Sequence, residues 1–124
     1  MNTYSFEKLD VFKNARVFVR KIFLLTAELE LRDKFGLRNQ IQRAAVSVIS
    51  NLAEGCARIS GKEQARFTEI AFGSLMEVLS QLVILKDLDL IDDAVMNEFR
   101  MMIDEIANKL NKLRASQLKK HLRS

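Results

Sequence analysis

The chain has 124 residues, enough for one domain with its own hydrophobic core, and a formal net charge of +4. Its single cysteine, Cys56, excludes an internal disulfide and is typical of a reducing compartment. No signal-peptide pattern opens the sequence, and no apolar run approaches the roughly 20 residues that span a bilayer. We therefore expect a soluble, cytoplasmic protein without membrane association.

Four helices are predicted in chain order. The sequence contains no proline, and apolar residues recur every three or four positions through four stretches. Ser60 and Glu63 form a capping box, and Asp92 is a good N-cap for the last helix. Short connections make neighbouring helices antiparallel, which predicts an all-α, up-down-up-down four-helix bundle in one domain, residues 1–124. The predicted helices span about residues 8–29, 37–58, 61–87 and 93–118.

The first predicted helix has an apolar face wider than a one-sided helix needs. One stripe includes Phe12, Val19 and Ile22. Beside it lies a second apolar row of Val11, Phe18 and Leu25, which Val17 and Leu24 extend. Two explanations for this wide apolar face stay open. Either the helix is unusually deep in the core, or a second subunit covers the row. We expect an oligomer whose interface includes Val11, Phe18 and Leu25.

Basic residues form two stripes. The first lies on a flank of the first helix, and the second lies on residues 109–124, which carry six basic residues and no acidic one. Some cations of the second stripe lie near the C-terminus of the helix, where they interact favourably with the helix dipole. For both stripes, the alternative to a binding surface is a basic face that is simply solvated. An anionic partner, RNA or DNA, is the functional reading. The candidate phosphate-binding residues are Lys13, Arg16, Arg20, Lys109, Lys112, Lys119, Lys120 and Arg123.

A polar row is predicted around the corner between the second and third helices. We interpret it as a structural network of ion pairs and amide hydrogen bonds. Its members are Arg43, Asn51, Glu54, Arg58 and Arg66. Ile59 is expected to continue the inward stripe of the second helix. Gly73, in mid-helix, is expected to admit the backbone of the second helix or of a neighbouring subunit.

No pattern in the sequence calls for catalysis. His121 is the only histidine, so no Glu-x-x-His pair or histidine–cysteine cluster exists to bind metal. Neither a P-loop nor a GxGxxG motif occurs. We expect no catalytic residues, no metal and no cofactor, and we predict that the protein is not an enzyme.

The central stretch carries a resemblance to a known family. Residues 35–77 read FGLRNQIQRAAVSVISNLAEGCARISGKEQARFTEIAFGSLME. This closely resembles the signature of the bacterial 23S rRNA intervening-sequence proteins. The likeness covers about residues 6–90, with Phe12 where tryptophan is common, and leaves residues 91–124 without landmarks.

The resemblance implies more than the residue patterns do. Family members look like four-helix bundles that assemble as ring-shaped homopentamers. A related branch, the accessory variability determinants of diversity-generating retroelements, binds a reverse transcriptase and nucleic acid through a basic surface. We therefore expect a non-enzymatic oligomer that associates with RNA or RNA/DNA, with a reverse transcriptase or another protein as a possible partner. The alternative is a protein–protein adaptor or scaffold with no nucleic-acid role.

Overall fold

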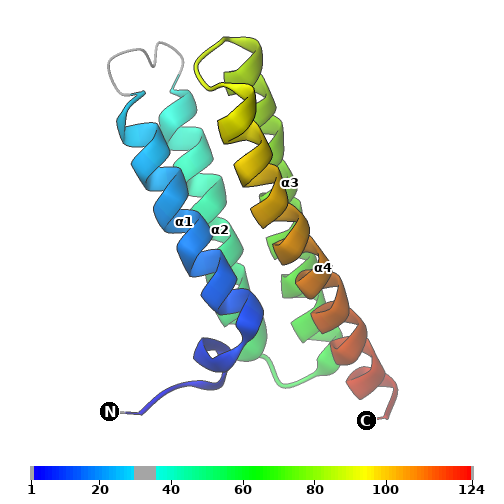
Figure 1. The fold of residues 1–124 in the computed structure, drawn as a ribbon. Helices are drawn as coiled ribbons and strands as arrows, with labels where there is room; N and C mark the ends of the chain where they lie inside the picture. The colour runs from blue at the N-terminus through cyan, green and yellow to red at the C-terminus, as the bar shows by residue number, and fades with distance from the viewer. Residues whose placement is uncertain (1, 30–35, 124) are drawn as a thin grey trace.

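The computed structural model describes residues 2–29 and 36–123, with side chains up to Lys120. A short 3-10 helix, η1 (Ser5–Lys8), precedes four α-helices: α1 (Asp10–Ala27), α2 (Leu37–Cys56), α3 (Gly61–Asp87) and α4 (Asp93–Arg123). Successive helices run in opposite directions and lie side by side (Figure 1). The predicted all-α, up-down-up-down bundle is confirmed, and the described residues contain no strand.

The core forms because each helix turns one face inward. The side chains with almost no exposed surface recur at three- and four-residue spacings, which place them on one side of a helix. The largest of them come from all four helices: Phe18, Ile22, Ile41, Val48, Leu52, Leu75, Val78, Leu82, Leu85, Ile103, Ile106 and Leu110.

The α2–α3 corner is tight and well defined. The Ser60 hydroxyl accepts a hydrogen bond from the Glu63 backbone N–H at 3.1 Å, which confirms Ser60 as the N-cap. The reciprocal bond of the predicted capping box, from the Ser60 backbone N–H to the Glu63 side chain, does not form. A Cβ atom at Gly55 would lie 3.1 Å from Cβ of Phe67, which is closer than ordinary van der Waals contact, so a larger residue there would push the two helices slightly apart. Ile59 lies beyond the end of α2 with 94% of its surface exposed. The expectation that Ile59 points inward is therefore wrong.

Gly73 does not serve a close approach within the chain. It lies on the exposed side of α3, and a Cβ atom there would meet no atom within 4 Å. The expectation that α2 approaches Gly73 is wrong, because α2 packs against the opposite, buried side of α3. The expectation of a neighbouring subunit at Gly73 stays a prediction.

Two features of α3 and α4 differ from the sequence-based expectation. By length and composition α3 could cross a membrane, with a mean hydropathy of 1.4 over 18 residues, contrary to the expectation that no such run exists. A central helix of a bundle meets the same criterion, and α3 packs against both α2 and α4.

The last helix extends to Arg123 rather than to residue 118. Near the end of this helix, Gln117 is buried against α3, where Thr68 donates a 2.7 Å hydrogen bond to its Oε1.

A pair of truncations on α1 tests which of its apolar side chains belong to the core. Phe18 has no exposed surface, whereas Leu24 is 60% exposed. Phe18→Ala should lower the free energy of unfolding by about 3–5 kcal/mol, because it removes a buried ring and leaves a cavity. Leu24→Ala should change it by less than about 0.5 kcal/mol. Urea denaturation followed by circular dichroism measures both, and equal losses would contradict this arrangement of α1.

Candidate nucleic-acid interface

The basic stripe on α1 lies on the side of the helix that faces solvent. Lys13, Arg16 and Arg20 are exposed and, with Val17 between them, line a shallow groove. None of the three cations makes a hydrogen bond or ion pair with a residue that the structure describes. Their charges are therefore available to an anion in solution.

The basic stripe on α4 divides into two parts. Lys109 is half-buried and engaged, donating to Oδ1 of Asn14 at 2.7 Å and to Oε1 of Glu105 at 3.2 Å. It connects α4 to α1 inside the chain, so the structure does not favour Lys109 as a phosphate ligand. Lys112, Lys119 and Lys120 are exposed, and the described part of the chain offers them no ion pair. The side chain of Arg123, also predicted, lies outside the described residues.

The contact between α1 and α4 brings the Lys13 end of the first stripe close to the second stripe, whereas Arg20 lies beside Lys21, which pairs with Glu98 near the start of α4. Lys13 precedes Asn14, which binds Lys109, and Lys112 lies three residues further along α4. The opposite end, where α3 turns into α4, carries the carboxylates of Asp87, Asp89, Asp92 and Asp93. Figure 1 shows this turn at the top and the end of α4 at the bottom. The carboxylates of this turn and the cations of the last part of α4 thus lie at opposite ends of the bundle.

The residues predicted at an oligomer interface mostly belong to the core of the single chain. Val11 and Phe18 are buried, and the Phe18 ring contacts the Phe99 ring edge to face, with centroids 6.1 Å apart. Leu25 is half-buried against the same core. The structure does not favour Val11 and Phe18 as interface residues, because both are buried within the single chain, Phe18 against Phe99 of α4.

Other apolar side chains of α1 remain at the surface instead. Val17 is 54% exposed, and Phe23 and Leu24 are exposed as well. Two of these, Val17 and Leu24, extended the second row in the sequence. The apolar surface left to a partner is therefore narrower than expected and lies among the cations of α1.

The predicted polar network is three separate local contacts. Nδ2 of Asn51 donates to Oγ of Ser47 at 3.0 Å, and the Ser47 hydroxyl hydrogen-bonds Ser74 of α3 at 2.8 Å. Arg58 pairs with Glu54 at 3.1 Å, whereas Arg66 lies 3.6 Å from Glu63. Arg43 is exposed and has no partner among residues 2–29 and 36–120.

The sequence did not reveal that Arg58 and Arg66 share an aromatic neighbour. Their guanidinium carbons lie 4.6 Å and 5.9 Å from the centroid of the Phe67 ring. The turn between α2 and α3 brings them together, and helical periodicity does not extend through a turn.

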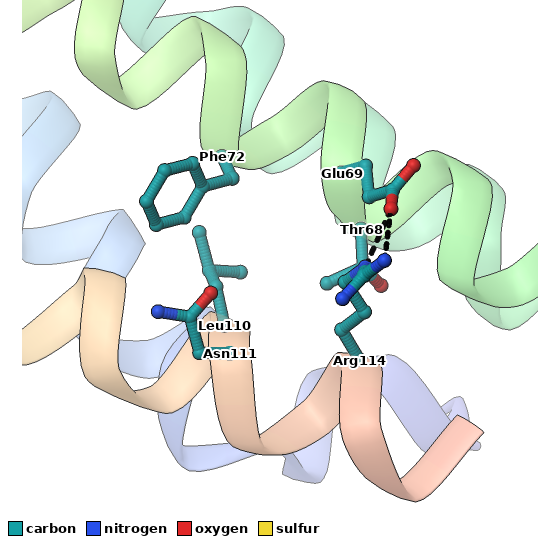
Figure 2. Close-up of a pocket in the computed structure, with 6 residues that line it drawn as sticks. All are labelled: Thr68, Glu69, Phe72, Leu110, Asn111 and Arg114. Carbon is teal, nitrogen blue, oxygen red and sulfur yellow. Dashed lines mark hydrogen bonds and ion pairs between the residues drawn. The ribbon is translucent and has the colours of Figure 1, made fainter. Parts of the chain in front are cut away.

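A pocket between α3 and α4 also escaped the sequence-based reading. Figure 2 shows Phe72 and Asn111 on one side and the Glu69–Arg114 pair on the other. Nε of Arg114 donates to Oε1 of Glu69 at 2.6 Å. Neither Glu69 nor Arg114 belongs to a site predicted from the sequence. The only signal was their opposite charge, which does not show that they are neighbours.

Cys56 is the last residue of α2. It is half-buried, and this burial raises the pKa of its thiol because the thiolate loses solvation. Within the described residues, no group of three or more histidine, cysteine, aspartate or glutamate side chains is arranged to hold a metal ion.

One of two comparisons with known proteins gives a match. Residues 7–112 match the family model described as 23S rRNA-intervening sequence protein. A comparison with curated proteins finds no match. The family match reaches Lys112 of α4, beyond residue 90, where the recognisable landmarks of the sequence end. The resemblance noted from the central stretch is confirmed.

The raised pKa of Cys56 predicts slow alkylation at neutral pH. A thiol that ionises at higher pH is less reactive at pH 7–8, because the thiolate is the nucleophile. At neutral pH, the rate constant for the reaction of Cys56 with iodoacetamide should be lower in the native protein than in the urea-unfolded protein. As the pH is raised, the native rate constant should reach its plateau at a higher pH than the unfolded one. Mass spectrometry over a pH series measures both, and a native rate equal to or above the unfolded rate would contradict the prediction.

Proposed function

Because the chain belongs to the 23S rRNA-intervening sequence protein family, we propose that it is a non-enzymatic, oligomeric, cytoplasmic protein that binds RNA through its basic end. The RNA assignment draws on the family name and on the surface cations. Contacts would come from the exposed α1 and α4 residues: Lys13, Arg16, Arg20, Lys112, Lys119 and Lys120.

One observation carries this proposal: the six cations are exposed and lack an acidic partner among the described residues. Some cations elsewhere on the bundle are paired, as in Lys21–Glu98 at 2.7 Å and Lys86–Asp93 at 3.3 Å, whereas Arg43 is exposed and has no acidic partner among the described residues. An unpaired cation releases counterions from RNA without first breaking an ion pair, so it contributes more to binding.

Phosphate contacts of this kind position an RNA without reading its sequence. Each protomer would bind weakly at its basic end. An oligomer would present this end several times, and each further contact would then form at a high effective concentration.

A matched pair of double variants tests the RNA proposal. Lys119→Gln with Lys120→Gln should weaken binding of a single-stranded RNA at low salt. The slope of log K against log salt should shrink by about 1.4, since each phosphate contact contributes about 0.7. Fluorescence anisotropy across a salt series measures this change.

The control is Lys21→Gln with Lys86→Gln, which removes the same net charge from lysines that already pair with Glu98 and Asp93. Its effect on the slope should be much smaller. Equal effects of the two double variants would show that only net charge matters, and salt-independent binding would overturn the proposal.

The exposed apolar residues of α1 support a second candidate, a protein–protein adaptor or scaffold. Val17 and Leu24 lie on the solvent side of the helix, and their burial by another chain would be favourable. The occupant would be a second copy, as the oligomer requires, or another protein such as a reverse transcriptase. In this candidate the cations serve solubility rather than RNA binding.

Light scattering tests whether the exposed face of α1 assembles copies. Leu24→Glu should lower the mass in solution while leaving the helical circular dichroism spectrum unchanged, because the charge would have to be buried in the assembly. Met101→Glu is the control, since Met101 is also exposed but lies on α4. If Leu24→Glu leaves the mass in solution unchanged, the exposed face of α1 does not form the interface between copies.

A further inference from the structure

The pocket between α3 and α4 is small, and its sides differ in chemistry: one side carries an aromatic ring and an amide, and the other carries an ion pair. Its volume is about 230 Å³, below the 300–1,000 Å³ typical of sites for drug-sized ligands. Thr68 and Leu110 are buried beneath it, and the hydrogen bond from Thr68 to Gln117 fixes this floor. The half-buried Phe72 contributes an aromatic ring (Figure 2). A single planar ring system fits these dimensions better than a whole nucleotide.

The polar groups of the pocket favour a neutral ligand. The charges of Glu69 and Arg114 compensate each other on one side of the pocket, so neither of them is a free charge that attracts a phosphate. The side-chain amide of Asn111 has no hydrogen bond with any residue that the structure describes. It offers a donor and an acceptor side by side, the pair by which asparagine reads the edge of a base.

We propose that this pocket holds one unstacked nucleobase of the RNA, against Phe72 and hydrogen-bonded to Asn111. The inference rests on the proposed RNA function and adds a site that recognises a base rather than a phosphate. Aromatic side chains that stack bases, with amides that bond their edges, are the usual way proteins recognise single-stranded RNA.

The surroundings of the pocket provide the phosphate contact that such a base needs. Lys112 follows Asn111 directly on α4, is exposed, and has no ion pair within the described part of the chain. Successive helix residues point about 100° apart and Lys112 does not line the pocket, so its long side chain would contact the phosphate of a flanking nucleotide rather than that of the bound base. Lys119 and Lys120 continue the basic surface towards the end of α4.

Two substitutions with matched controls test the base site on the full chain. Phe72→Leu keeps an apolar side chain but removes the ring, and Asn111→Ala removes the amide. Each should weaken binding of a ten-nucleotide adenosine RNA by about tenfold, the loss expected for one stacked base. The salt slope should not change, because no cation is lost. Phe23→Leu and Asn108→Ala, on exposed positions of α1 and α4, should stay within about twofold of the unchanged protein.

An abasic RNA of the same length gives a readout that does not depend on any variant folding. The unchanged protein should bind it about tenfold more weakly than the adenosine RNA, and Phe72→Leu should weaken it no further. Equal affinity for the two RNAs, or unchanged affinity in both pocket variants, would overturn the base site while leaving salt-dependent RNA binding intact.

Adenosine alone separates the pocket from the proposed function. In an NMR titration, the side-chain amide resonances of Asn111 should shift and saturate as adenosine is added, whether or not the protein binds RNA. No shift would overturn the inference. A shift that follows protein concentration instead would also overturn it, because a second copy would then fill the pocket.

Discussion

Each helix of this bundle packs against two neighbours, and this constraint determines how much apolar surface remains for other molecules. The first helix shows it most clearly. Both α2 and α4 cover α1, so the apolar arc of α1 must be wide enough to meet two helices. Phe18 belongs to the α4 side of that arc, against Phe99. A wide apolar face on a bundle helix is therefore not by itself a sign of a second subunit.

The same packing decides which cations are free. Lys109 and Lys112 belong to one basic stripe in the sequence, yet Lys109 turns to Asn14 and Glu105 while Lys112 remains in solvent. Carboxylates gather at the α3–α4 turn, and cations without an acidic partner among the described residues gather at the far end of α4. Such a separation orients an approaching polyanion before any contact forms.

The proposed RNA surface and the proposed base pocket have complementary chemistry. Exposed lysines attract phosphates over a distance that salt limits to about 8–10 Å. The pocket has no free charge, and its Glu69–Arg114 pair leaves shape, Phe72 and Asn111 as its means of recognition. Affinity would come from the first surface and selectivity for an unstacked base from the second.

The sequence by itself determined the local features: four helices, the Ser60 cap, the tight corner and the family. These depend on residues close together in the chain, where the 3.6-residue period and capping rules apply. Only the tertiary structure decided that α4 covers Phe18, that Lys109 binds Asn14 and that Arg114 meets Glu69 beside a pocket. The period shows which side chains share a face of one helix. It does not give the rotation and axial offset between helices, and these set every contact between residues 45 to 95 positions apart.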